Sequence, residues 1–376
     1  MFGSHARVPF GERGGRVRGA LDFLAGRYPA FLLGGEIGRL LPVFHFHQTT
    51  VSELEPKLQY LAENGYRTVT STAIAGLVRD GVPPPPRSVA LAFDDAWSSL
   101  WTVAGPLLRR YRMQGIAYAI PGRIREAAAV RPTIVDGPVD SVRLDAAADP
   151  LVTWPELQCL HSDGTFDVQS HSLTHSLMFA APVVSDFVSP AFTSESPLNR
   201  PRLDRNGPLR FLSAESLGAP LYVRRSRLSD ARRFFPNPDV STRCVAHVAD
   251  HGGPRFFDRA DWRAELRRVA GEIRGDFEDE AARNAAIARE LQGARDELEA
   301  RLSGHAVDHI CLPWGVAGRV TWKALERCGY RTAFANRFRG RFAVASGDDP
   351  YALKRLANRH IFALPGRGRR WLFSGR

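Results

Sequence analysis

The sequence predicts an α/β fold: a barrel of parallel strands with helices outside it, interrupted by a long insertion. Two observations predict this class. Apolar strand-like segments alternate with helical segments over residues 85–122 and 153–170, as in chains that build a parallel sheet from βα units. Residues 180–259 are rich in Pro, Arg and Ser and hold no long apolar period. They exceed an ordinary connection of about 4 to 6 residues, which predicts an insertion.

The clearest strand is residues 88–93 (Ser-Val-Ala-Leu-Ala-Phe), which follow a Pro-rich turn and are apolar throughout. Asp94 and Asp95 come directly after it. Functional residues of α/β barrels lie at the carboxyl ends of the strands, so both carboxylates are expected there. Successive side chains leave a strand in different directions. One aspartate can therefore bind a metal while the other faces a bound water.

Residues 153–164 predict a capped helix that Gly164 ends, and the following strand, 166–170, delivers His171 and then His175. Two imidazoles and one carboxylate form an open metal site, which lowers the pKa of a bound water towards ~7. The other aspartate can then act as general base. Two plainer interpretations stay open: Asp-Asp serves in turns and helix caps, and His-x-x-x-His also occurs on solvated helix faces.

These motifs resemble those of the polysaccharide deacetylase family, also called the NodB-homology or carbohydrate esterase 4 family. Residues 92–96 (Ala-Phe-Asp-Asp-Ala) are similar to the family's Thr-Phe-Asp-Asp-Gly motif. Residues 171–175 (His-Ser-Leu-Thr-His) match its His-(Ser/Thr)-x-x-His motif. The resemblance covers residues 41–178 and resumes from about residue 285 to 335.

The resemblance implies a distorted, incomplete (β/α) barrel and a hydrolase that removes an N-acetyl or other N-acyl group from an amino-sugar substrate by attack of metal-bound water. It assigns Asp94 as catalytic base, and Asp95, His171 and His175 as ligands of one divalent metal. Zinc is the expected ion, with cobalt, nickel or manganese as alternatives. The expected substrate is an amino-sugar glycan, glycolipid or glycoconjugate.

The third family motif is only partly present. Members often carry Arg-x-Pro-Tyr there, with the arginine orienting the catalytic aspartate, whereas residues 311–315 read Cys-Leu-Pro-Trp-Gly. The missing arginine leaves the orientation of Asp94 unexplained. The backbone N–H of Trp314 is still expected to stabilise the oxyanion, because a backbone donor does not depend on its side chain.

The resemblance also implies a late histidine that protonates the leaving amine. His360, in a strand-like run over residues 356–365, is the late candidate, and a structural or surface histidine is the equal alternative. His45 or His47 could line the site instead, since alternation places both on one face of the first strand and Phe44 and Phe46 on the other.

Four parts are expected from these segments. They are an N-terminal extension (1–40), a deacetylase-like barrel (41–179 and 260–365), an insertion or cap (180–259) and a basic C-terminal tail (366–376). Residues 261–302 show apolar residues at helical spacing on a charged background. The insertion leaves the barrel directly after His175, so we expect it to form a cap that faces the substrate, and a segment that covers the side of the barrel is the alternative.

The composition limits the classes of binding partner that the chain is expected to have. The chain of 376 residues has a net charge of +11, carried almost entirely by arginine and spread along the sequence. No zinc-finger spacing or RNA-binding aromatic signature accompanies it, so we expect no nucleic-acid partner. The basic surface suits an anionic or lipid-linked substrate, with at most peripheral membrane contact. No signal peptide or membrane span is evident, and we expect a cytoplasmic location with reduced cysteines.

Two other functions remain open on the same scaffold. One is hydrolysis of a non-sugar amide or of an ester. The other is a non-catalytic carbohydrate-binding relative, suggested by the missing arginine and by the unassigned general acid.

Overall fold

The computed structural model of the protein describes residues 25–140, 143–144, 150–205, 207–335 and 341–370. Within them the chain forms two compact units. The barrel unit holds the described residues of 25–174, 289–316 and 322–370, and the insertion unit holds His175–Ala288 and Ala317–Thr321.

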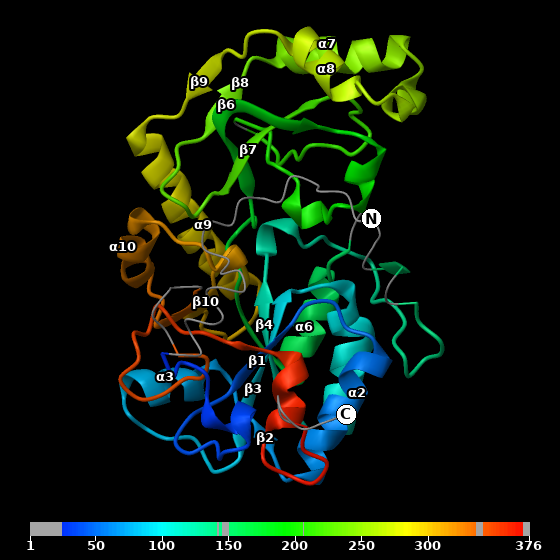
Figure 1. Ribbon diagram of the computed structural model, residues 1–376. Coiled ribbons are helices and arrows are strands. Elements are labelled where there is room, and N and C mark those ends of the chain that lie inside the picture. Colours follow the sequence, from blue (N-terminus) through cyan, green and yellow to red (C-terminus); the bar gives the residue numbers. More distant parts are fainter. Residues whose placement is uncertain (1–24, 141–142, 145–149, 206, 336–340, 371–376) are drawn as a thin grey trace. The chain divides into compact units, whose positions relative to one another are not determined.

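The barrel unit is built on a single eight-stranded sheet whose strand pairs are all parallel (Figure 1). The strand order is β11-β10-β5-β4-β3-β1-β12, with β2 paired to β3 off this path. The strands are β1 (Val43–Phe46), β2 (Arg67–Thr68), β3 (Ser88–Asp95), β4 (Gly115–Ala119), β5 (Phe166–Ser170), β10 (His309–Cys311), β11 (Thr332–Phe334) and β12 (Leu356–Ala357).

The two ends of this sheet meet through one short connection. Phe334 of β11 forms a parallel bridge with Leu353, which lies just before β12. The Leu353 N–H donates to the carbonyl of Ala333, and the Ala335 N–H donates to the carbonyl of Leu353. A single bridge thus stands where a full strand pair would close a barrel. The predicted distorted, incomplete (β/α) barrel is confirmed.

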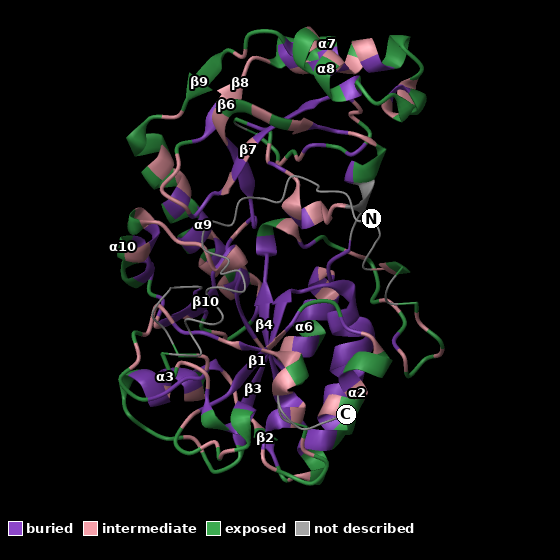
Figure 2. Ribbon diagram, viewed as in Figure 1, coloured by how far each residue is buried: buried purple, intermediate pink, exposed green. Residues whose placement is uncertain are grey.

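Helices cover the outside of the sheet, and the strands are the most buried part of the unit (Figure 2). Leu91 and Phe93 pack with the helices in an outer core, whereas Ala90 and Ala92 face an inner core that contains Tyr118. The helices are α2 (Val51–Glu63), α3 (Ser71–Arg79), α4 (Gly105–Arg110), α6 (Trp154–Ser162), α9 (Glu280–Arg301) and α10 (Arg319–Arg327).

Helix α6 shows how local sequence sets an element. Thr153 and Glu156 form a capping box at its start, and Gly164 follows its end with φ 73°. Glu156 is fully buried, and Arg131 satisfies it with a bidentate hydrogen bond. The predicted capped helix is confirmed, because caps at both ends satisfy backbone groups that the helix itself leaves open.

The predicted helical pattern over residues 261–302 is interrupted. It forms α8 (Trp262–Ala270) and α9, separated by the short strand β9 (Gly275–Phe277). Gly271, with φ 61°, ends α8. Trp262 and Leu266 of α8 and Ile287, Leu291 and Leu298 of α9 are buried, whereas Val269 is only partly buried. The helical spacing was thus largely correct, but a continuous helix was wrong.

The insertion unit has its own strands, helices and apolar cores. Strands β6 (Leu177–Phe187) and β7 (Pro220–Ser226) form one antiparallel pair, and β8 (Phe234–Pro236) and β9 form another. One core includes Phe179, Leu221 and Phe234 from the strands. Helix α7 (Pro238–Asp250) packs on α8 in a second core. Short segments from several elements supply these cores, which explains why no long apolar period marks the sequence.

The predicted terminal segments are only partly described. Residues 1–24 of the predicted extension and residues 371–376 of the predicted tail lie outside the described residues. Within the extension, Phe31 and Leu32 of the short turn η1 (Ala30–Leu33) are buried in the outer core of the barrel unit. Over the part of the chain that the structure covers, no helix is long and apolar enough to cross a membrane.

Candidate functional site

The alternation of β3 places Asp94 on the inner face of the sheet. Ala90 and Ala92 lie on that face, and Asp94 continues the same two-residue period. Its side chain is 3% exposed. The inner position follows from the alternation of the strand, because the intervening residues Leu91 and Phe93 face the helices.

Asp95 ends the strand in a left-handed conformation, with φ 69°. Its Oδ2 accepts a hydrogen bond from Nε1 of Trp97 at 2.9 Å. His175 (φ 49°) and Trp314 (φ 54°) share this unusual backbone region. A left-handed conformation costs about 1 kcal/mol or more for each non-glycine residue, and such residues concentrate at functional sites.

Backbone and side-chain contacts fix the segment that follows β5. The N–H of His171 donates to the carbonyl of Ala119 at 2.8 Å. Glu290, which is 4% exposed on α9, accepts a hydrogen bond from the N–H of Thr174 at 2.9 Å and a second from its hydroxyl. The N–H of Leu173 donates to the backbone carbonyl of Glu290 at 2.9 Å. These contacts determine where the two histidines of the motif lie.

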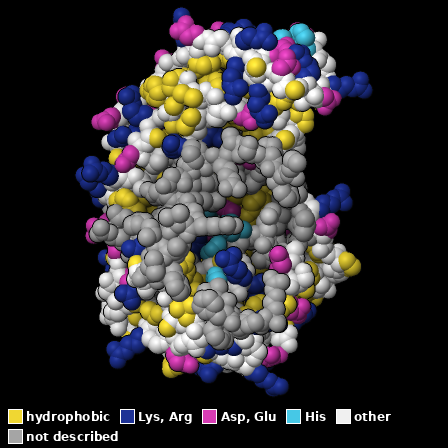
Figure 3. All heavy atoms as spheres, viewed as in Figure 1, with side chains coloured by type: hydrophobic (Ala, Val, Ile, Leu, Met, Phe, Trp, Pro, Cys, Tyr) yellow, Lys and Arg dark blue, Asp and Glu magenta, His cyan; other side chains and the backbone are white. Residues whose placement is uncertain are grey.

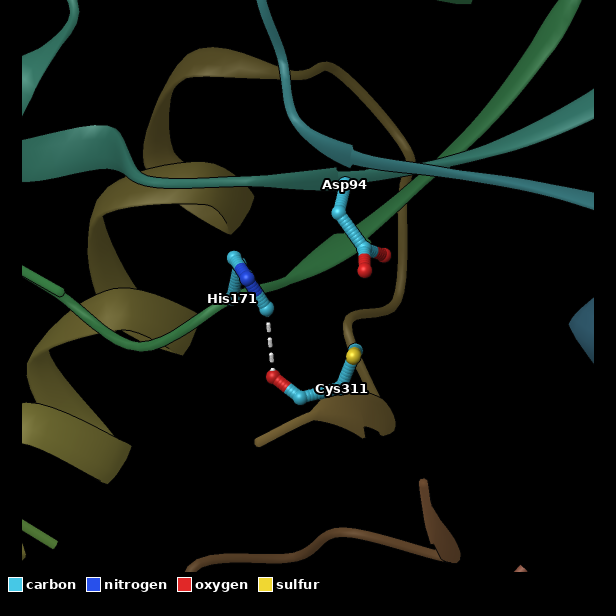
Figure 4. A group of neighbouring side chains, drawn as sticks. All are labelled: Asp94, His171 and Cys311. Atoms are coloured by element: carbon cyan, nitrogen blue, oxygen red, sulfur yellow. Dashed lines mark hydrogen bonds between the residues drawn. The ribbon is translucent and has the colours of Figure 1, made fainter. Parts of the chain in front are cut away.

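The tautomer of His171 is set by the neighbouring strand. Its Nδ1 donates to the backbone carbonyl of Cys311 at 2.6 Å, a contact that Figure 4 shows. Its Nε2 then lies 3.3 Å from Oδ1 of Asp95. Burial by itself lowers the pKa of this imidazole, but Cys311 and the two neighbouring carboxylates raise it well above its ordinary value. The position therefore favours a positive charge.

The structure brings the three predicted ligands together. Donor atoms of Asp95, His171 and His175 all lie within 4.8 Å of one another, and the three residues are buried. His175 is the first residue of the insertion unit and follows Thr174 directly in the chain. Two imidazoles and one carboxylate suit zinc and similar divalent ions, and a fixed Nδ1–H on a metal-binding histidine is usual. The donor set fits the predicted metal.

Asp94 has a partner that the sequence did not reveal. Nη1 and Nη2 of Arg355 donate to its Oδ1 and Oδ2 at 2.6 and 2.7 Å. The guanidinium also lies over the rings of Phe334 and Tyr118, at 5.2 and 5.9 Å. Burial by itself raises the pKa of Asp94, but Arg355 outweighs it and holds the pKa well below its usual range.

Arg355 supplies the arginine that the third motif lacks, from a different place in the chain. It lies just before β12, between the buried residues Leu353 and Leu356. The available signal was the pair of charged residues Lys354 and Arg355 inside a short apolar run. Arg355 accounts for the orientation of Asp94 that the sequence left unexplained, since the sheet brings this arginine from the other side of β1.

Two further histidines approach the inner aspartate from β1 and the residue after it. Nε2 of His47 lies 3.6 Å from Oδ2 of Asp94, and its side chain is 53% exposed. His45 forms an edge-to-face pair with His47, with ring centroids 5.7 Å apart. Burial, followed by the charge of Arg355, lowers the pKa of His45 to about 3. Phe44 and Phe46 face the outer core, as alternation predicts. Figure 3 shows histidine atoms at the surface beside Lys or Arg atoms in this region.

Trp314 and His360 occupy turns. Trp314 lies in the turn η7 (Pro313–Gly315), directly after β10 and Leu312. The strand-like run predicted around His360 is instead a 3₁₀ turn, η8 (Asn358–Ala363), preceded by only two strand residues, because β12 ends at Ala357. Burial lowers the pKa of His360 to about 4. The roles assigned to both residues stay predictions.

Cys311 shares the site without an assigned role. Its thiol is buried, and Figure 4 shows it beside Asp94 and His171. Burial raises the pKa of this thiol above its ordinary value. The side chain lines the site, and the backbone carbonyl of Cys311 makes the contact that orients the histidine.

The family model for polysaccharide deacetylases matches residues 81–198, the segment that carries both aspartates and both histidines. This segment of the chain is similar to the polysaccharide deacetylase family. The predicted resemblance is confirmed, and the matched segment runs from the loop before β3 into the first part of the insertion unit.

Individual relatives are more distant. A stretch of 71 residues is 32% identical to the poly-β-1,6-N-acetyl-D-glucosamine N-deacetylase of Escherichia coli K12, covering 19% of this chain but only 11% of that protein. Among solved structures, a de-N-acetylase from Aggregatibacter actinomycetemcomitans has 14% identity and a TM-score of 0.47, covering 84% of this chain and 94% of its own. The BpsB deacetylase domain from Bordetella bronchiseptica has 15% identity and a TM-score of 0.48, covering 85% and 96%.

Proposed function

We propose that the chain is a metal-dependent hydrolase that removes an N-acetyl group from an amino-sugar unit of a glycan, glycolipid or glycoconjugate. The single observation that supports this proposal best is the pair of unequal aspartates. Asp94 is held ionised by Arg355, whereas Asp95 lies with His171 and His175 in a buried donor group. The match of residues 81–198 to the polysaccharide deacetylase model and the different surroundings of the two aspartates both support this chemistry.

The donor group would hold one divalent cation, with zinc expected first. When bound, such an ion supplies Lewis-acid polarisation of the acyl oxygen and of a water molecule. The rest of the chemistry falls to the side chains and backbone of the chain. Nδ1 of His171 stays fixed on the Cys311 carbonyl, which keeps Nε2 directed at the donor group.

The reaction needs a base beside the attacking water. A water oxygen bonds to the acyl carbon, the carbon–nitrogen bond breaks, and acetate and a free amine result. Asp94 takes the proton from the water. Arg355 occupies one lone pair on each of its oxygens, and each oxygen keeps another for that proton. The cost of this arrangement is a weaker base, because its pKa is held low.

The leaving nitrogen must gain a proton, and two histidines compete for that role. His47 is exposed and its Nε2 lies 3.6 Å from Oδ2 of Asp94. His360 is the residue expected from the family resemblance, and its low pKa leaves it neutral near pH 7. Geometry favours His47. The Trp314 N–H remains the expected oxyanion donor.

A non-catalytic protein was considered because the motif arginine is missing and the general acid is unassigned. The first reason no longer holds, because Arg355 takes the place of the missing arginine. A panel of substrates separates the remaining alternatives. The purified chain, loaded with ZnCl2, is incubated with N-acetylglucosamine oligomers, a linear N-acetyl amide and an acetyl ester. Acetate and free amine are then measured.

Release of acetate and amine from the oligomers, lost after chelation and restored by zinc, supports the proposal. Turnover of only the amide or the ester would assign the non-sugar alternative. No turnover by a zinc-loaded chain that binds the oligomers would favour a binding protein.

A further inference from the structure

The insertion unit holds a second group of metal-binding side chains, separate from the hydrolase site. Donor atoms of His247, His251 and Glu265 all lie within 4.8 Å of one another. We propose that these residues bind a second divalent ion of the zinc class, which links α7 to α8. The proposed deacetylase chemistry uses none of them.

The two histidines are placed by ordinary helix geometry. His247 lies in the last turn of α7, and His251 is the residue that caps its end. Residues four apart lie on one helix face, and here the rings stack with centroids 4.0 Å apart at 27°. A helix C-terminus carries a partial negative charge that favours a bound cation. Figure 3 shows histidine and acidic side chains together at the surface at the α7 and α8 end of this unit.

Hydrogen bonds set the available nitrogen of each ring. Nδ1 of His251 donates to the backbone carbonyl of His247 at 2.8 Å, which leaves its Nε2 as an acceptor with a free lone pair. This is the same type of contact that orients metal-binding histidines in known sites. Nε2 of His247 lies 2.7 Å from Oε1 of Glu265, so a proton bridges the two atoms when no metal is present. A cation would replace that proton.

Glu265 reaches the histidines from the first turn of α8. Its other oxygen, Oε2, pairs with Arg259, which also contacts Asp261 at 3.3 Å and lies over the ring of Phe256 at 5.4 Å. Arg259 therefore engages the oxygen that faces away from His247. One carboxylate oxygen and two imidazole nitrogens remain as ligands.

This donor set selects a class of metal. Two imidazoles with one carboxylate suit zinc, cobalt, nickel or copper, whereas calcium and magnesium prefer sites made entirely of oxygen. Helices α7 and α8 already pack through Cys244, Val248 and Leu266 in a common core. An ion bound across their surface would add a cross-link at the edge of that core and stabilise the folded unit.

The test measures how many zinc ions the full chain binds, both in the wild-type protein and in the His171→Ala variant. Metal-stripped protein is titrated with ZnCl2 by calorimetry, and bound zinc is counted after dialysis. Wild-type protein and His171→Ala, which removes a proposed ligand of the hydrolase site, each receive His251→Gln. His161→Gln, at a part-exposed histidine of the barrel unit, is the matched control.

In both backgrounds His251→Gln should remove one equivalent of zinc, and His161→Gln should remove none. Zinc should raise the Tm of His171→Ala, and this shift should disappear in His171→Ala/His251→Gln. Equal stoichiometry with and without His251→Gln would overturn the proposal. The result does not depend on the hydrolase assignment, since loss of zinc in His171→Ala alone reports on the other site.

Discussion

Two of the three His-x-x-x-His pairs in this chain lie in groups of possible metal ligands, and they reach their positions by different means. His247 and His251 lie at the end of a helix, where spacing alone places both rings on one face. His171 and His175 follow a strand, and His175 has a left-handed backbone. The same sequence spacing therefore arises from regular geometry in one unit and from a fixed loop in the other.

Their surroundings differ as well. The barrel pair is buried beside two aspartates, and Glu290 and the Cys311 carbonyl hold its loop. The pair on α7 is partly exposed and has one carboxylate and a competing arginine. Hydrolysis of a substrate needs a general base that is not itself one of the metal ligands. Among the described residues, Asp94 is such a base beside the barrel pair, and the pair on α7 has no counterpart to it. The spacing of two histidines is therefore not enough to define a metal site, because the neighbouring charged groups determine what the pair can bind and do.

The largest expected effect follows from removing the proposed base. Asp94→Asn should lower kcat by about 10³-fold, within the range for loss of general base catalysis, and should leave zinc content unchanged. His171→Ala should lose both turnover and one zinc. Steady-state kinetics and metal analysis on the same samples check this. Wild-type activity in Asp94→Asn would remove the base assignment.

Replacing each candidate general acid tests which histidine protonates the leaving nitrogen. His47→Gln should lower kcat by about 10²-fold, because its imidazole would no longer supply a proton to the leaving nitrogen. His360→Gln should change kcat by less than about threefold. The reverse pattern would return the role to His360.

Arg355→Gln should affect both stability and pH dependence. It leaves the buried Asp94 without its cation, which should cost about 3 kcal/mol in the free energy of unfolding. Without Arg355, burial raises the pKa of Asp94, so the acid limb of kcat/KM should move to higher pH. In the wild type, the lowered pKa contributes stability above the unfolded value of about 3.9, which is lost only as pH falls further.

Denaturant unfolding and a kcat/KM profile measure these changes, and Arg355→Lys should recover part of the stability. An unchanged acid limb in a folded Arg355→Gln protein would show that this arginine does not control Asp94.

The smallest expected effect concerns the loop that carries the barrel pair. Glu290→Ala leaves the N–H of Thr174 without its acceptor and should cost about 1–3 kcal/mol. Zinc affinity of the barrel site should fall roughly 10-fold or more, as for loss of a residue that orients ligands. Glu297→Ala, on the exposed face of the same helix, is the control. Equal zinc affinity in both variants would argue that the loop holds its shape without Glu290.

Much of the barrel site could be predicted from local pattern. The two-residue period of β3 determines that Asp94 faces inward, and the residues after β5 determine where the histidines enter. The third-motif turn and the capped helix before β5 also follow from nearby residues. The predicted run around His360 failed, because a strand of two residues is too short to show a period.

The sequence by itself determined the elements, their order and the identity of the acid and imidazole groups, because alternation, caps and turns act between neighbouring residues. Only the tertiary structure decided which distant groups complete the site. Arg355 meets Asp94 across 261 residues, and the Cys311 carbonyl meets His171 across 140. Such contacts exist because the sheet brings β12 beside β1 and β10 beside β5, and no local period in the chain encodes that meeting.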